Sequence, residues 1–378
     1  MQTKRMRGYE MNALEKTEKY LNTYLKDYSR YKTYWNYEDG CVLKAARDFY
    51  EYTNDEKYIL FILDYLKECI SEEGRIVNYE EGKYNIDSVN SGKCLFAAYD
   101  YTKEDKYKKA IEQIMNQVRT QPRCKCGNFF HKKIYPDQIW LDGLYMAQPF
   151  YMEYETRFDN KEGYADIVSQ FENVQKYMLN EEKGLCYHGY DESRSIFWAD
   201  KESGCSKNFW LRSMGWYLMA LVDVLDHMDS DIYEKYHALL DIYRKMVAGI
   251  IPYMDEESGL FYDVIDRPDV QGNYLETSGS AMVAYAILKG CNMGILLSEK
   301  YAPIGKKIME GLMDRMLTEK EDGIHLTGIV SVSGLGPADN ERRDGSVAYY
   351  LSEPVVEDDP KGTGCFFMAY VQYLKAIG

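Results

Sequence analysis

The sequence has no long apolar run and no feature that would direct it into a membrane. None of its 378 residues lies in an uninterrupted apolar stretch of about 18 residues, the length that a membrane-spanning helix needs. The basic N-terminal segment MQTKRMRGYEMNALEK is not followed by the apolar stretch of a secretory signal. We therefore expect a cytoplasmic protein that does not insert into a membrane, and a monomer as the default state.

Positive charge is also in short supply. The 46 Lys and Arg residues are outnumbered by 61 Asp and Glu residues, which gives a formal net charge of -15. This balance argues against nucleic acid as a partner, because nucleic-acid binding depends on cations that neutralise phosphates. An acidic surface also repels anions at long range, so an anionic ligand would need a local basic group inside its pocket.

The nine cysteines are an odd number and are scattered, and the closest pair is Cys124 and Cys126. Because there is no export signal, we expect thiols rather than disulfides. A Cys-x-Cys together with His131 could indicate zinc, but the spacing fits no standard zinc finger, and two reduced thiols are the simpler interpretation. We expect no metal and no cofactor.

The sequence is rich, by contrast, in one repeated helical pattern. Six segments open with glycine and continue with about ten small or apolar residues and little charge. These segments begin at Gly40, Gly92, Gly143, Gly215, Gly279 and Gly364. A helix that is apolar nearly all round must be buried on nearly all sides.

Amphipathic stretches lie between these segments, for example at 57–70, 106–118 and 233–250, with apolar positions at helical spacing. Six buried helices that alternate with six amphipathic ones predict two concentric rings, an all-α (α/α)6 barrel built as one domain over residues 1–378. An open helical solenoid is the alternative, but no terminal repeat resembles a polar cap. Strand signals are limited to GRIVNY and GLFYDVI, which predict short extended pieces in loops.

Acidic and aromatic residues recur just before the six glycines, so the parallel inner helices should gather them at one mouth of the ring. They are Glu38, Asp39, Asp87, Asp142 and Glu276, with Trp140, Trp210 and Arg212. Acids at these positions can simply be helix caps or first-turn acids, and we favour that interpretation for Glu38, Asp39 and Glu276. Asp142 differs because Trp140, Leu141 and Leu144 surround it. An apolar setting favours a protonated carboxyl group, which a general acid needs.

The block FFHKKIYPDQIWLDGLYMAQPFY, from Phe129 to Tyr151, resembles the signature of the unsaturated rhamnogalacturonyl hydrolases, glycoside hydrolase family 105, which is related to family 88. The resemblance continues through HGYDESRSIFWAD, NFWLRSMGW, GNYLETSGSAM and GTGCFFMAY, in the expected order over nearly the whole chain. The long block is highly specific, although the two cysteines before it stand where small or glycine residues are expected.

The resemblance implies an (α/α)6 barrel that needs no metal and acts on small acidic unsaturated oligosaccharides from pectin. In this family an aspartate protonates the double bond of a 4,5-unsaturated galacturonate, water adds, and the sugar ring opens. By position, Asp142 is the expected proton donor, and Asp87 is expected to orient the sugar or the water. The residues expected to bind substrate are Tyr37, His131, Lys132, Trp140, His188, Trp210, Arg212 and Trp216. Arg212 is the candidate partner of the uronate carboxylate, because a guanidinium fork matches a carboxylate.

Three other functions stay open at this point. The same ring occurs in unsaturated glucuronyl hydrolases that act on glycosaminoglycan fragments, although the block around Asp142 favours the pectin-type group. A non-catalytic sugar-binding barrel would keep Trp210, Trp216 and Arg212 but could lose Asp142. A ring-fold epimerase would need paired histidines at the mouth, where only His131 and His188 are candidates.

Overall fold

The computed structural model describes residues 12–159 and 161–378. The N-terminal segment that lacks an apolar export stretch falls largely outside this description, since residues 1–11 are not part of it. In the part of the chain that is described, no helix combines the length and the apolar character needed to cross a membrane.

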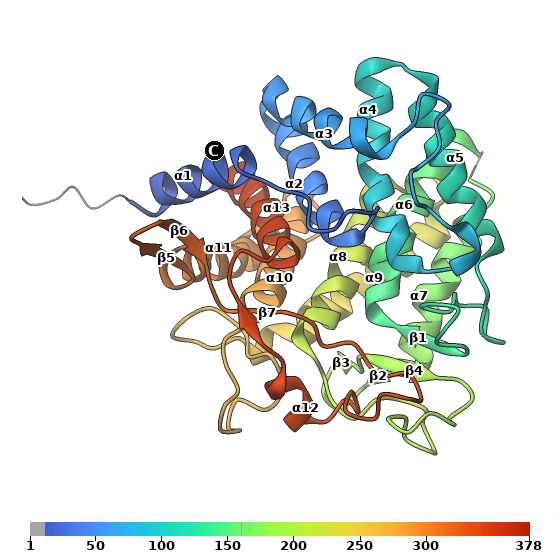
Figure 1. Ribbon diagram of the computed structural model, residues 1–378. Helices are drawn as coiled ribbons and strands as arrows, with labels where there is room; N and C mark the ends of the chain where they lie inside the picture. Colours follow the sequence, from blue (N-terminus) through green and yellow to red (C-terminus); the bar gives the residue numbers. More distant parts are fainter. Residues whose placement is uncertain (1–11, 160) are drawn as a thin grey trace, which may run out of the picture.

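Six helices form an inner ring, and each has one of the six glycines at or just before its first turn. They are α2 (Tyr37–Thr53), α4 (Lys93–Thr102), α6 (Leu141–Phe158), α8 (Leu211–His227), α10 (Thr277–Asn292) and α13 (Pro360–Ile377). A 3-10 segment, η2 (Ile86–Gly92), leads into α4 and packs between α2 and α6. The remaining helices pack side by side, and α13 returns to α2, which closes the ring (Figure 1). The predicted closed barrel is therefore confirmed.

Six further helices surround this ring and bury one face each. They are α1 (Ala13–Lys26), α3 (Glu56–Cys69), α5 (Asp105–Thr120), α7 (Tyr164–Met178), α9 (Tyr233–Ile250) and α11 (Ser298–Arg315). In α5, for instance, Ala110, Ile111 and Ile114 are buried while the lysines on the opposite face reach solvent. This division is the one that an amphipathic pattern predicts. Three short helical segments complete the set: η1 (Glu81–Lys83), η3 (Ile251–Tyr253) and α12 (Val347–Ser352).

The strands are short and lie in the connections between helices. The described residues form four antiparallel pairs: β1 (Gln138–Trp140) with β4 (Gly189–Asp191), β2 (Leu179–Asn180) with β3 (Leu185–Cys186), β5 (Leu317–Lys320) with β6 (Gly323–Leu326), and β7 (Ile329–Val330) with β8 (Val355–Val356). The two segments predicted to be extended form isolated bridges instead, at Ile76 in the first and at Tyr262 and Val264 in the second.

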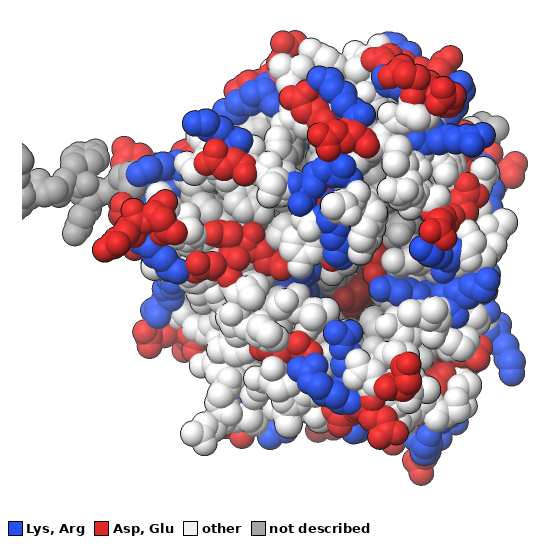
Figure 2. Space-filling view, in the orientation of Figure 1, with Lys and Arg blue, Asp and Glu red and all other residues white. Residues whose placement is uncertain are grey.

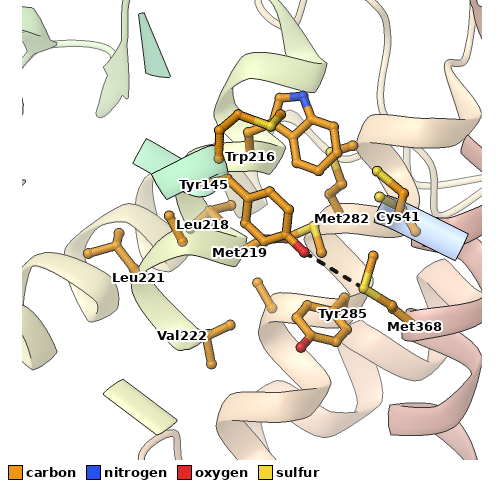
Figure 3. Close-up of a cluster of buried hydrophobic side chains, with 14 of the residues drawn as sticks. Cys41, Tyr145, Trp216, Leu218, Met219, Leu221, Val222, Met282, Tyr285 and Met368 are labelled. Carbon is orange, nitrogen blue, oxygen red and sulfur yellow. Dashed lines mark hydrogen bonds between the residues drawn. The ribbon is translucent and has the colours of Figure 1, made fainter. Parts of the chain in front are cut away.

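Side chains fill the middle of the ring. Tyr145 stacks on Trp216 with ring centroids 4.8 Å apart, and its hydroxyl lies 3.8 Å from the Met368 sulfur (Figure 3). Glycine allows neighbouring helices to come close, because a β-carbon on Gly364 would lie only 2.6 Å from the backbone of Cys41. The barrel is thus plugged, and Trp216 at the top of the plug forms part of a cavity floor.

Candidate active site

A cavity of about 370 Å³ opens where the inner helices begin. Figure 2 shows a hollow near the centre of this face, with acidic atoms in its depth and basic atoms along its rim. The volume lies at the small end of the range for ligand sites. The predicted site residues that line the cavity are Tyr37, Asp87, His131, Lys132, Trp140, Asp142, Trp210, Arg212 and Trp216. The structure therefore brings together all the predicted site residues except His188, which lies behind Asp142.

The β1–β4 ribbon joins Asp142 to His188. Trp140 on β1 is paired with Gly189 on β4, and the Leu141 N–H donates to the His188 carbonyl at 3.1 Å. Asp142 follows in the first turn of α6, where its Oδ2 lies 3.4 Å from His188 Nε2. Both atoms are buried and have no hydrogen-bond partner among the described residues. An unsatisfied buried polar group costs about 1–3 kcal/mol, so such a pair needs a functional explanation.

His188 is held in place from its other side. Its Nδ1 lies 2.9 Å from the Tyr350 hydroxyl, and its ring lies 4.8 Å from the Trp210 ring. The imidazole is completely buried. The expected direct contact of His188 with sugar is therefore replaced in this structure by contact with Asp142, and Tyr350 is a supporting residue that the sequence did not reveal.

Asp87 has an entirely different environment from Asp142. A backbone bridge between Asn85 and Lys132 places Lys132 Nζ 2.7 Å and His131 Nε2 3.3 Å from the Asp87 carboxylate. Burial favours a raised pKa for Asp87, but the charge of Lys132, together with that of His131 at acidic pH where its ring is protonated, outweighs burial and holds the pKa below its usual range. Burial lowers the pKa of His131 to about 4. Near pH 7 the site therefore contains an ionised Asp87 and a neutral His131.

An aromatic stack forms the wall next to these carboxylates. The His131 ring lies 4.4 Å from the Trp140 ring at an interplanar angle of 14°, and Tyr135 stacks on the Trp140 ring at 5.0 Å. A β-carbon on Gly143 would lie 3.0 Å from His131 Nδ1. Gly143 therefore allows the His131 ring to lie close to the first turn of α6.

Arg212 lines the cavity but uses most of its donors within the protein. Its Nε donates to the Ser278 hydroxyl at 2.7 Å, its Nη2 to the Val330 carbonyl, and its Nη1 to the Ser331 carbonyl at 3.3 Å. Glu276 lies 3.7 Å from Nη2. Because an arginine has five N–H groups, these three hydrogen bonds leave one N–H on Nη1 and one on Nη2, the latter near Glu276. Arg212 is thus held in place by three hydrogen bonds within the protein, and its positive charge lies at the cavity.

All three acids interpreted as helix caps or first-turn acids lie at helix starts, and one of them also lines the cavity. Glu276 caps α10 by accepting the backbone N–H groups of Ser278 and Gly279 at 3.1 and 2.7 Å. Asp39 is completely buried in the first turn of α2 and accepts from the Tyr31 N–H and the Tyr65 hydroxyl. Glu38 differs from both, since it lines the cavity, where it is paired with Lys32.

Several cavity residues were not found from the sequence. Met146 lies one helical turn after Asp142, so its i+4 spacing could have revealed it. Residues 331–346, which we call the strap, contribute Val332, Ser333, Gly334 and Arg343, and no local pattern marks them as site residues.

The cysteines and acids offer no metal centre in residues 12–159 and 161–378. No group of three or more His, Cys, Asp or Glu side chains there could hold a metal ion. All nine cysteines are unpaired, including Cys124 and Cys126.

Comparison with known proteins identifies the family. The family described as Glycosyl Hydrolase Family 88 matches residues 3–377. A family 105 glycoside hydrolase from C. acetobutylicum of known structure superposes with a TM-score of 0.88 at 39% identity, over 96% of this chain and 99% of that one. Protein Atu3128 of Agrobacterium fabrum is 40% identical over 233 residues, which are 61% of this chain and 98% of that protein.

A curated enzyme extends the comparison to activity. The unsaturated rhamnogalacturonyl hydrolase YesR of Bacillus subtilis is 23% identical over 297 residues, which are 76% of this chain and 77% of that protein. The chain therefore belongs to glycosyl hydrolase family 88, together with the related family 105 enzymes, and is a glycoside hydrolase of the unsaturated uronyl type.

Proposed function

We propose that the protein removes the 4,5-unsaturated galacturonate from the non-reducing end of oligosaccharides derived from rhamnogalacturonan. The observation that carries this proposal is the state of Asp142. Its carboxyl group lines the cavity, and one of its oxygens is buried without a hydrogen-bond partner among the described residues. Among the described residues, His188 is the one basic side chain within 4 Å of the Asp142 carboxylate. The similarity to YesR supports the choice of sugar.

In the proposed reaction Asp142 delivers its proton to C4 of the vinyl ether, and positive charge develops at C5 and the ring oxygen. Water adds its oxygen at C5 and returns a proton to Asp142, so that one water is consumed. The resulting hemiketal opens and releases the leaving saccharide. Positioned acid–base groups of this kind contribute about 10²–10⁴-fold to the rate.

The remaining residues have distinct proposed roles. Asp87, held as a carboxylate by Lys132, accepts a hydrogen bond from a sugar hydroxyl or from the attacking water and stabilises the cationic transition state. Lys132 and Arg212 supply the local positive charge that an anionic sugar needs in a protein of net charge -15. The aromatic faces of Tyr37, Trp140, Trp210 and Trp216 pack against the sugar rings. His188 positions Asp142.

We also propose that the enzyme acts in the cytoplasm as a monomer. The nine unpaired cysteines support a reducing compartment. Gel filtration would test the oligomeric state.

The direct test is incubation with the products of a rhamnogalacturonan lyase while the absorbance of the double bond is followed. We expect the absorbance to disappear and a free saccharide to form. A parallel reaction with an unsaturated disaccharide from a glycosaminoglycan lyase should be much slower. Faster turnover of the glycosaminoglycan fragment would assign the enzyme to the glucuronyl type, and binding without turnover of either would refute a catalytic role.

A further inference from the structure

Five lysine and arginine side chains line the active-site cavity, and one of them differs from the others in its ion pairing. Lys32 is paired with Glu38, Lys83 with Glu80, Lys132 with Asp87 and Arg212 with Glu276. Arg343 is the exception, since none of the described carboxylates lies within 4 Å of its guanidinium group. Its neighbour Arg342, which does not line the cavity, is bound to Glu353 at 2.8 Å.

The strap that carries Arg343 leaves two buried polar atoms unsatisfied. Within the described part of the chain, neither Arg343 Nε nor the hydroxyl of the completely buried Ser333 has a hydrogen-bond partner. Both residues line the cavity. Each unsatisfied group costs about 1–3 kcal/mol, and a cation without a counter-ion in an acidic protein attracts an anion. A guanidinium group and a hydroxyl that line the same cavity are suited to a carboxylate or a sulfate.

The strap is fixed rather than loose at this point. Trp198 donates from its indole to the Gly336 carbonyl at 3.1 Å, and the Tyr349 hydroxyl donates to the Gly334 carbonyl at 2.6 Å. Gly334 lies between two cavity groups, because a β-carbon there would be 3.4 Å from the Trp140 ring and 3.5 Å from Arg343 Nη1. Arg343 is thus presented on the outer side of the Trp140 wall by a preorganised segment.

The depth of Arg343 indicates which sugar it meets. A terminal uronate must place its double bond beside Asp142, which lies in the first turn of α6. Arg212, which is almost fully buried, lies in the first turn of α8 at the same end of the ring. Arg343 belongs instead to the strap, which passes from β7 toward α12 along the edge of the hollow (Figures 1 and 2), and its side chain is partly exposed. An anion at Arg343 therefore belongs to the leaving saccharide, nearer the opening.

We propose that Ser333 and Arg343 form a second anion site, which binds the carboxylate of a further uronate in the leaving saccharide. This inference rests on the proposed function, because it assumes that the terminal sugar reacts at Asp142. It makes the preferred substrate an oligosaccharide with at least two uronates, whereas a disaccharide with a neutral leaving sugar leaves the site empty.

The test compares three unsaturated substrates: the disaccharide with a neutral leaving rhamnose, the tetrasaccharide with an internal galacturonate, and the same tetrasaccharide methyl-esterified at that galacturonate. The R343Q variant should lose roughly 10- to 100-fold in kcat/KM on the acidic tetrasaccharide. It should change less than about twofold on the other two substrates. The R342Q variant is the matched control and should behave like the wild type on all three.

Equal losses on all three substrates, or no loss on any, would overturn the second anion site. A sulfated leaving sugar added as a fourth substrate shows whether the site prefers sulfate, and a larger R343Q effect there than on the carboxylate would overturn the assignment to a uronate. Thermal unfolding of R343Q shows whether this variant stays folded. If it does not, the S333A variant replaces it and should lose kcat/KM on the acidic tetrasaccharide by a smaller factor.

Calorimetric titration separates this proposal from the proposed function. A saturated oligosaccharide with an internal galacturonate should bind the wild type more tightly than R343Q, whether or not the enzyme turns over the unsaturated substrates. If the wild type fails to cleave any of them but this difference in binding is found, the reaction is wrong and the anion site stands. Equal binding to both proteins would overturn the anion site.

Discussion

The two ends of the inner ring treat their carboxylates differently. Away from the mouth, Glu153 in α6 is held by Arg47, whose Nη1 and Nη2 donate to it at 2.7 and 2.8 Å, and Asp223 in α8 is paired with Lys289 at 2.8 Å. All four side chains are buried. Burial would raise the pKa of Glu153, but Arg47 lowers it to about 2. These acids are permanently ionised and tied to a partner.

At the mouth three acids have three different surroundings. Asp87 is ionised beside Lys132, and Glu276 caps the start of α10. Asp142 has one oxygen without a hydrogen-bond partner among the described residues. Acids that share one pocket but have different partners are typical of acid–base sites. We call the end of the ring with the Arg47–Glu153 and Lys289–Asp223 ion pairs the closed end. The comparison indicates that its acids stabilise the fold, whereas the unsatisfied carboxyl oxygen of Asp142 at the mouth lowers stability and is available for a reaction.

The largest effect should come from Asp142→Asn. The amide keeps the size of the side chain but has no proton to give, so we expect kcat to fall by about 10²–10⁴-fold while substrate still binds. Calorimetry with the unsaturated substrate and thermal unfolding check that binding and fold persist. Activity close to that of the wild type would show that the proton comes from elsewhere.

Glu153→Gln should have the opposite consequence at the closed end. It removes the carboxylate that Arg47 Nη1 and Nη2 bind and leaves Arg47 with the half-exposed Glu51, which is 2.7 Å from its Nε. Breaking a buried ion pair in this way costs up to about 3–5 kcal/mol of unfolding free energy. Because Glu153 does not line the cavity, kcat per folded molecule should stay unchanged. Urea unfolding and activity at matched folded concentration measure the two quantities.

A surface pair provides the control for this change. Lys67 and Asp64 are 2.6 Å apart, and both side chains are about 70% exposed. Lys67→Gln should therefore cost less than about 1 kcal/mol. If Glu153→Gln were as mild as this control, or if it lowered kcat without lowering stability, the division of labour between the two ends would be wrong.

Lys132→Met tests the ionised acid at the mouth. Removing this cation raises the pKa of Asp87, so Asp87 loses its charge at a higher pH than in the wild type. The acid limb of the pH profile of kcat/KM should move up by about one pH unit. Lys133→Met, which changes an exposed neighbour outside the cavity, should leave the profile in place. An unmoved acid limb in Lys132→Met would mean that the reaction does not need Asp87 as a carboxylate.

The comparison also shows what the sequence could and could not reveal. The inner helices were predictable because burial on all sides leaves a compositional mark, and Gly40 and Gly364 mark where two of them begin. Asp142 could be singled out because its apolar neighbours are local in the sequence. The contact between Asp142 and His188 depends on the pairing of β1 with β4, two segments some 50 residues apart. Strands this short leave no sequence pattern from which their pairing could be predicted.

Contacts made by loops were the least predictable part of the site. Tyr350 reaches His188 across 162 positions of the chain, and Arg343 reaches the cavity from the strap, which has little regular structure. The sequence did not indicate that Arg212 bonds within the protein, because two of its acceptors are the backbone carbonyls of Val330 and Ser331, which carry no side-chain signal. Such positions are set by tertiary packing rather than by local pattern, so a single sequence leaves them open.

The smallest expected effect concerns a fourth acid, Asp263, which lies beside Trp210 and which burial keeps neutral. Asp263 is completely buried, accepts from the Trp210 indole N–H at 3.0 Å, and has no basic partner within 4 Å among the described residues. Burial, reinforced by the nearby Glu276, raises its pKa to about 8. In the unfolded chain its pKa is about 4.

The folded protein therefore holds a proton that the unfolded chain has already released at neutral pH. The stability that this group contributes is present below about pH 4 and is lost as the pH rises to about 8. Asp263→Asn removes the titration but can still accept from Trp210, so its melting temperature should exceed that of the wild type by roughly 2 °C or more at pH 8 and by less at pH 5. Asp269→Asn, at a side chain that is 77% exposed, should show no such trend. A gain that is the same at both pH values would mean that Asp263 is ionised throughout, and the mouth would then hold a second carboxylate charge beside Arg212 and Glu276 rather than a neutral support for Trp210.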